Sequence, residues 1–208
     1  MMKCLFSRHA RLTGAAVAVL GIAVMSGTPA HAALISTSAC NNATLTEPFA
    51  HWGDTNDYEL VPGGSFESGA PGWTLTRGAK IVSGSEPFGA TGSVGKYSLD
   101  VPAGASVTSP FTCVNAAYPS FRFFARNHGL LSIMAVSVVY RTVLGLEVTL
   151  PVGVSTLSGT WGPSLPMLTG SVVTGLLSGG TTQVALRFTE LTGNSQIDDV
   201  FVDPRCRW

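Results

Sequence analysis

The chain has 208 residues, only 12% of them charged, and its 12 basic residues balance its 12 acidic ones. This balance excludes a strongly basic nucleic-acid-binding protein, and a hydrophobic content of 45% excludes a disordered chain. The 24 Gly and 12 Pro residues argue against a helical bundle, because both residue types interrupt helices. The length favours a single domain.

Residues 1–32 are predicted to be a secretory signal peptide. Lys3, Arg8 and Arg11 form a positive start, and residues 13–25 are apolar and uncharged. That stretch is shorter than the roughly 20 residues of a membrane span, and the small-residue sequence Ala30-His31-Ala32 follows as a cleavage site. The alternative is an N-terminal membrane anchor. We therefore expect a secreted, extracellular protein without membrane insertion.

Removal of residues 1–32 leaves 176 residues and takes away three basic residues but no acidic one, so the net charge becomes −3. Three cysteines remain: Cys40, Cys113 and Cys206. Disulfides persist in an oxidising compartment, and three cysteines allow one bridge in three possible pairings. We favour Cys40–Cys113, with Cys206 free, because Cys206 lies near the chain end. No two cysteines have the spacing of a zinc site.

Short runs of alternating apolar and polar residues, separated by Gly, Pro, Ser and Asn, predict strands along the mature chain. They cover residues 58–61, 73–76, 80–82, 96–101, 105–114, 120–126, 132–142, 146–154, 182–191 and 196–202, with a possible short helical turn at 172–177. This pattern predicts an all-β protein, a single-domain antiparallel β-sandwich spanning 58–204. Residues 33–57 are expected to be a leader packed on that domain, and residues 205–208 a C-terminal tail.

The strongest strand signal is the run of residues 120–126. Phe121 and Phe123 share one face and are predicted core residues, whereas Arg122 and Arg126 share the other face. The arginine face could line a concave sheet, or it could be a solvated outer face.

Three segments resemble galactose-binding-like jelly-roll domains. Residues 61–78 read VPGGSFESGAPGWTLTRG, residues 92–101 read GSVGKYSLDV and residues 196–204 read QIDDVFVDP. These segments are similar to the first, third and last strand regions of that fold, which many carbohydrate-binding modules share. The resemblance covers residues 58–204, and the whole chain also looks like a group of small secreted bacterial proteins.

The resemblance implies a structural Ca²⁺ site that ties the first and last strands together. Its ligands would be the carboxylate of Glu67, the carbonyl oxygen of Lys96, and the carboxylate of Asp198 or Asp199. Such hard oxygen donors suit Ca²⁺. Strand alternation would put Asp198 and Asp199 on opposite faces, so at most one would reach the site. The alternative is that these acids are solvated or paired with basic residues.

Sugar binding commonly uses aromatic rings together with planar polar side chains. Candidates with this chemistry are Trp52, Tyr140, Arg141, Arg122 and Trp161. Trp161 lies between Gly and Pro in a predicted turn, where aromatic residues are better binding candidates than in strands. The alternative is that each of these side chains packs locally.

The sequence contains neither a Gly-x-Ser-x-Gly nor a His-Glu-x-x-His motif. We therefore expect a secreted, non-catalytic binding module whose partner is a carbohydrate, such as a cell-envelope glycan. A different hypothesis is a structural or surface-associated protein that acts through protein–protein contacts. An enzyme is the third and weakest hypothesis.

Overall fold

The computed structural model describes residues 44–115, 120–128, 131–142, 144–156, 158–169 and 181–203. All of them belong to one compact unit, His31–Trp208. The predicted signal peptide, the helical turn at 172–177 and the tail at 205–208 lie outside the described residues. Within the described ranges, no helix is long and apolar enough to cross a membrane.

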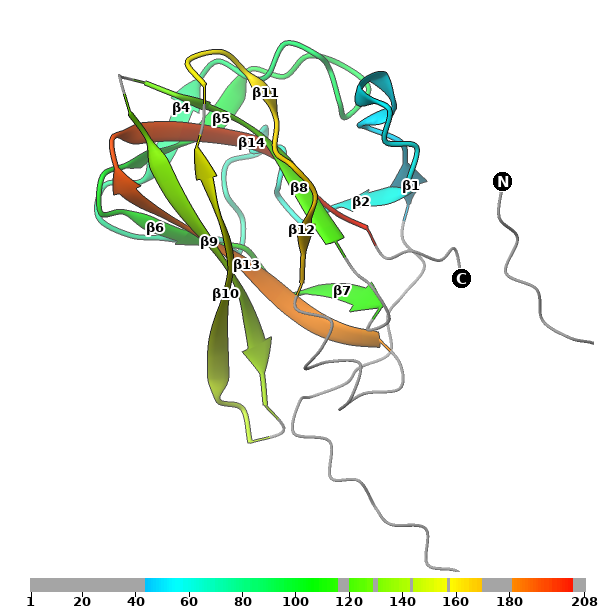
Figure 1. Cartoon of the computed structure of the whole chain (residues 1–208), viewed down its shortest axis with the longest axis vertical. Helices are drawn as coiled ribbons and strands as arrows, with labels where there is room; N and C mark the ends of the chain where they lie inside the picture. The colour runs from blue at the N-terminus through cyan, green and yellow to red at the C-terminus, as the bar shows by residue number, and fades with distance from the viewer. Residues whose placement is uncertain are drawn as a thin grey trace, which may run out of the picture. The chain divides into compact units, whose positions relative to one another are not determined.

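One sheet is organised around the last strand, β14, and is called here the β14 sheet. It contains β1 (Leu45–Thr46), β2 (Tyr58–Leu60), β4 (Lys80–Ser83), β5 (Tyr97–Pro102), β8 (Ser120–Asn127), β11 (Gly162–Pro163), β12 (Met167–Leu168) and β14 (Asn194–Asp203). Along one side β14 pairs first with β5 and then with β2, and along the other side it pairs with β8. The short strands β11 and β12 pair with the far side of β8 and form a strap along it (Figure 1).

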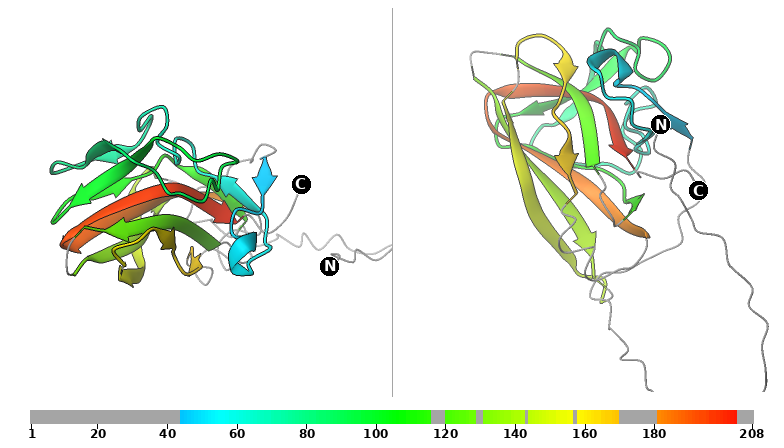
Figure 2. Two further views of the ribbon diagram at one scale, coloured as in Figure 1. Left: turned by 90° about the horizontal axis from the view of Figure 1, so that it is seen from above. Right: turned by 45° about the vertical axis from the view of Figure 1, so that its right-hand side comes forward.

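The second sheet is organised around β13 and is called the β13 sheet. It contains β3 (Thr74–Leu75), β6 (Ser106–Thr108), β7 (Thr112–Asn115), β9 (Ile133–Arg141), β10 (Glu147–Thr156) and β13 (Thr181–Thr192). Every strand pairing in both sheets is antiparallel. Figure 2 shows the two sheets from two further directions.

The main hydrophobic core lies between the sheets. Phe121 and Phe123 of β8 are fully buried there, as the alternation predicts, and the Phe123 ring meets Phe188 of β13 edge to face, 4.9 Å between centroids. Trp73 joins the same core and donates its indole N–H to the carbonyl of Pro62 at 3.0 Å. The predicted all-β antiparallel sandwich is therefore confirmed.

The observed strands follow the predicted ones closely, with one split. Residues 105–114 form two strands, β6 and β7, with Pro110 between them. Proline has no N–H for a ladder hydrogen bond, so it interrupts the pairing with β13. The strands β1, β11 and β12 were not predicted, because two residues are too few to show a period.

Residues 44–57 pack on the outer face of the β14 sheet. Phe49 is fully buried in a second cluster with Tyr58, Phe124 and Phe201, called here the outer cluster. Its ring stacks on that of Phe124, 5.2 Å between centroids. Strand β8 is consequently buried on both faces, which its alternating sequence does not indicate.

A β-bulge interrupts β14. Asp199 has a left-handed backbone with a φ of 42°, and the register with β8 shifts between Asp198 and Phe201. The backbone of Val200 is held at this point by Val61 and Gly64. A Cβ on Gly64 would stand 2.9 Å from the Val61 carbonyl oxygen, so glycine permits this close approach. The bulge therefore lets β14 change partner from β5 to β2.

Cys113 lies in β7 and is disulfide-bonded. Both candidate partners, Cys40 and Cys206, lie outside the described residues, so the pairing stays a prediction. We expect peptide mapping without reduction to find Cys40 joined to Cys113. Cys40→Ser would then lower the free energy of unfolding by about 4 kcal/mol, because the unfolded chain loses a long closed loop.

Cys206→Ser serves as the control and should leave both the bridge and the stability unchanged. A linked peptide that contains Cys113 and Cys206 would show the predicted pairing to be wrong.

Candidate functional site

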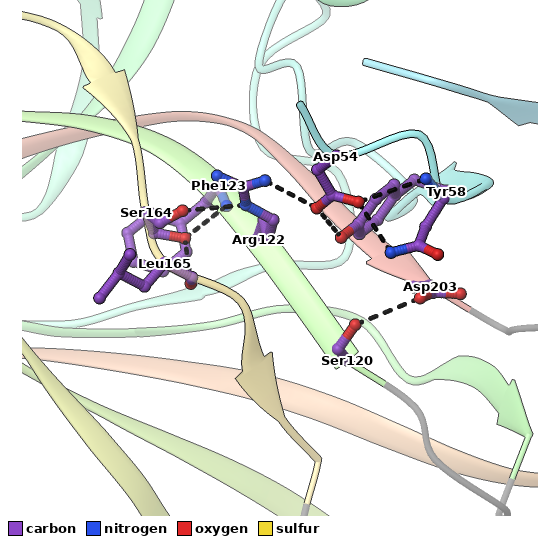
Figure 3. A network of polar contacts seen from close by, with 9 residues as sticks. Asp54, Tyr58, Ser120, Arg122, Phe123, Ser164, Leu165 and Asp203 are labelled. Carbon is purple, nitrogen blue, oxygen red and sulfur yellow. Dashed lines mark hydrogen bonds and ion pairs between the residues drawn. The ribbon is translucent and has the colours of Figure 1, made fainter. Parts of the chain in front are cut away.

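Arg122 joins three parts of the chain on the outer face of the β14 sheet (Figure 3). Its Nη1 contacts Asp54 Oδ2 at 2.7 Å, and its Nε donates to the carbonyl of Ser164 at 2.9 Å. Its guanidinium carbon lies 4.3 Å from the centre of the Phe49 ring. Arg122 was predicted to bind ligand, but its side chain is only 7% exposed and its contacts are internal. It connects the leader, β8 and the strap.

Asp54 is the acceptor at the centre of this network. Its carboxylate also accepts a hydrogen bond from the hydroxyl of Tyr58 at 2.7 Å. Burial alone would raise the pKa of Asp54, but the hydrogen bonds from Tyr58 and Arg122 outweigh it and hold the pKa below its usual value. Asp54 is therefore ionised and anchors the leader electrostatically.

Tyr140, a predicted ligand-binding residue, is buried and does not face a ligand. Its side chain is 1% exposed within the main core, and its hydroxyl donates to the carbonyl of Thr169. Arg141 lies at the end of β9 in the other sheet, 4.1 Å over the ring of Phe111 and 3.4 Å from Glu147. The structure thus places these two predicted residues away from the outer face of the β14 sheet.

Trp52 and Trp161, by contrast, pack against the same cluster although they are 109 positions apart. Both are half-buried and pack against the outer cluster. The Trp52 ring meets Phe124 at 5.4 Å between centroids. The guanidinium of Arg126 lies 5.0 Å over the Trp161 ring. Of the five predicted ligand-binding residues, only these two tryptophans are half-buried and pack against the outer cluster.

An open hollow of about 560 Å³ lies beside Trp52. Its lining residues include Thr46, Glu47, His51, Trp52, Phe88 and Thr91. Phe88 is 46% exposed, and its ring meets Trp52 edge to face at 4.9 Å. His51 meets Trp52 in the same way at 5.0 Å. Phe88 was not predicted; the only signal for it was an aromatic residue in the Gly-rich segment 84–95.

A polar row crosses the outer face of the β14 sheet next to Trp161. Lys80, Asp100, Gln196 and Arg126 occupy facing positions on β4, β5, β14 and β8. Facing residues on adjacent strands point to the same side of a sheet. Within the row, Arg126 Nε donates to Gln196 Oε1 at 2.8 Å. The row supplies planar polar groups beside the indole of Trp161.

The predicted Ca²⁺ ligands approach one place in the fold. Glu67 Oε1 accepts the backbone N–H of Lys96 at 2.8 Å, and Asp198 Oδ2 accepts the hydroxyl of Ser85 at 2.7 Å. A Cβ on Gly95 would collide with both Glu67 and Ser85, so Glu67 and the hydroxyl that donates to Asp198 lie on either side of this glycine. The carbonyl of Lys96 accepts the N–H of Gly84 at 2.7 Å.

The expectation that Asp198 and Asp199 face opposite ways is wrong. The bulge breaks the alternation and turns both toward Glu86, which was not predicted and is fully buried. Burial raises the pKa of Asp198 to about 7. Burial, together with the charges of Asp198 and Glu86, also raises the pKa of Asp199. Among the described residues, no group of three or more His, Cys, Asp or Glu side chains forms a metal cage.

No family model matches the sequence, and no curated protein matches it. Solved structures with a similar shape include the xylanase 10B of Clostridium thermocellum with its CBM22-1 and GH10 modules. It is 14% identical, with a TM-score of 0.44, over 69% of this chain and 27% of that one. The CBM22-1 xylan-binding domain from Paenibacillus barcinonensis is 15% identical, with a TM-score of 0.46, over 67% of this chain and 90% of the domain.

A third structure, TmCBM61 in complex with β-1,4-galactotriose, is 13% identical, with a TM-score of 0.41, over 69% of this chain and 96% of that one. These structures contain carbohydrate-binding modules, the class that residues 58–204 resemble in sequence. Similarity this distant does not bring the neighbours' ligands to this chain. The fold assignment rests on the two sheets themselves.

The Arg122–Asp54 pair leads to a pH-dependent prediction. We expect Asp54→Asn to lower the free energy of unfolding by about 2 kcal/mol at neutral pH, because hydrogen bonds to a charged group are lost. Since the pKa of Asp54 is lowered in the folded state, its contribution is present at neutral pH and disappears as the pH falls through that lowered value. Urea unfolding should therefore show the difference from wild type narrowing below about pH 4.

Glu147→Gln is the matched control, because that exposed pair lies 3.4 Å apart on the other sheet and should contribute little at any pH. If the free energy of unfolding of Asp54→Asn differs from that of the wild type by the same amount at neutral and acidic pH, Asp54 does not have the lowered pKa assigned to it.

Proposed function

We propose that this chain is a secreted, non-catalytic protein that binds glycans on the outer face of the β14 sheet. The observation that carries the proposal is the hollow beside Trp52, walled by Trp52 and Phe88 and bordered by polar side chains. Its volume of about 560 Å³ lies in the range of small-ligand sites.

The chemistry of the surface suits a sugar. A sugar ring presents C–H groups on its faces, which pack on aromatic rings, and hydroxyls at its edge, which need hydrogen-bonding partners. Trp52 is held by edge contacts with His51, Phe88 and Phe124, so little rotational freedom is lost when a ligand stacks on it. Thr46 and Thr91 supply hydroxyls to the same hollow.

A second patch supports binding of more than one sugar unit. Trp161 carries Arg126 over its ring, and Gln196 orients that guanidinium. Both tryptophans pack on the same outer cluster, so a chain of sugars could contact the two in turn.

We also propose that the protein does not catalyse a reaction on its ligand. A glycosidase needs two carboxylates that flank the scissile bond. Glu190 is fully buried, and it accepts the hydroxyls of Ser132 and Ser195, each at 2.6 Å. Glu86 is fully buried too and accepts backbone N–H groups of its own loop. Both carboxylates therefore have structural partners.

The site is tested by truncating its aromatic walls. We expect Trp52→Ala and Phe88→Ala each to weaken glycan binding by about tenfold or more, as loss of a stacking ring costs about 1–2 kcal/mol. A glycan array finds the ligand, and isothermal titration calorimetry measures the loss. Phe88 is the safer variant, because its ring is half-exposed and its removal spares the outer cluster.

Leu168→Ala, at a half-exposed site on the strap, is the control and should bind as wild type. If no glycan on the array binds, the proposed function is wrong, and the hypothesis of a protein acting through protein contacts takes its place.

We also propose that the protein binds a structural Ca²⁺ ion. Asp198, Asp199 and Glu86 are buried together, and no salt bridge joins any of them to a basic residue within the described ranges. A hard cation would offset this charge, with Glu67 and the carbonyl of Lys96 as further oxygen donors. The ion would join β14 to the segments before β3 and β5 without touching the glycan.

We expect Ca²⁺ at about one hundred times its dissociation constant to stabilise the fold by about 2.7 kcal/mol and raise Tm by roughly 5–10 °C, with EDTA reversing the effect. Differential scanning calorimetry of wild type and Asp198→Asn measures it. The variant should lose the Ca²⁺ response, whereas Glu147→Gln should keep it. If neither Ca²⁺ nor EDTA changes the Tm of the wild type, the proposed Ca²⁺ site is wrong.

A further inference from the structure

The hollow beside Trp52 has a distinctive charge. Glu47 is exposed and lines it, and none of the described residues along its wall is Lys or Arg. The nearest guanidinium in the leader network, that of Arg122, is already paired with Asp54. A ligand in this hollow therefore meets one free carboxylate together with aromatic rings.

Part of the wall of the hollow is held in place by Glu86. The carboxylate of Glu86 accepts the backbone N–H groups of Phe88 and Ala90, and both of these residues line the hollow. Because Glu86 is fully buried, it shapes the loop and does not meet the ligand. The exposed ring of Phe88 is thus presented to the hollow by a rigid turn.

Aromatic rings with one carboxylate are the combination that recognises an organic cation. An ammonium group is attracted to the face of an aromatic ring, and a nearby exposed carboxylate adds a weak ion pair. We propose that this hollow binds a protonated amino sugar, so that the preferred ligands are glycans with free amino groups. The inference rests on the proposed glycan-binding function and specifies its ligand class.

The same arrangement selects against acidic glycans. A uronic acid carboxylate in the hollow would face Glu47 as a like charge with no described Lys or Arg side chain on the wall to offset it. Neutral sugars would still stack on Trp52 and Phe88 but would gain nothing from Glu47. The expected order of affinity is amino sugar, then neutral sugar, then uronic acid.

The test uses two ligands that differ at the amino group, which is free in one and acetylated in the other: oligomers of glucosamine and of N-acetylglucosamine of the same length. Titration calorimetry is done at a fixed pH at which the amines are protonated. Wild type should prefer the glucosamine oligomer by about tenfold, equivalent to about 1.4 kcal/mol. The preference should shrink at high salt, because exposed charges are screened.

Glu47→Gln should abolish the preference, because the amide keeps the shape of the side chain and removes its charge. Glu147→Gln is the matched control, since it removes an exposed glutamate from the other sheet. Phe88→Ala should weaken both oligomers.

Three outcomes separate the two proposals. A wild-type preference that Glu47→Gln removes supports the inference. Equal affinities, or a preference that survives Glu47→Gln, overturn it, although Trp52-dependent binding of neutral glycans would leave the proposed function standing. If neither these oligomers nor any other glycan binds, both proposals fall.

Discussion

The buried contact between Arg122 and Asp54 is the interaction on which the outer face of the molecule depends. A charge removed from water is unfavourable unless it is paired, so each of these residues requires the other. Their pairing holds the leader against β8, where Phe49 closes the outer cluster. Loss of this pair would loosen the leader, which carries Trp52 and one side of the hollow.

The bulge in β14 is the second constraint, and it acts through backbone geometry. One extra residue lets β14 pair with β5 and then with β2, and it turns Asp198 and Asp199 toward Glu86. Glu86 in turn folds the loop that presents Phe88. The side chain of Glu86 therefore joins two places, the acidic cluster of Asp198, Asp199 and Glu86 and the aromatic hollow. A change in the position of Glu86 would alter the geometry of both.

Of the predicted ligand-binding residues, the two tryptophans pack on the outer cluster, whereas Arg122 and Tyr140, which lie in strands, make internal contacts. Trp52 and Trp161 were chosen for their chemistry, and both reach the outer face. Tyr140 has the same chemistry but sits in β9, where alternation directs it into the core. Arg122 was assigned to the correct face of β8, but its partner Asp54 lies 68 residues earlier, and no local pattern connects them. Glu86 and Phe88 were missed because nothing near them in the sequence indicates burial or exposure.

The sequence by itself determined the all-β class, most strand positions and the inward face of β8, because a period of two and the turn residues between strands are local properties. Only the tertiary structure decided that β8 is covered on both faces, that Asp198 and Asp199 lie together, and that Trp52 and Phe88 meet at Phe124. Each of these depends on contacts between distant segments, and a bulge of one residue is enough to reverse the direction that alternation predicts.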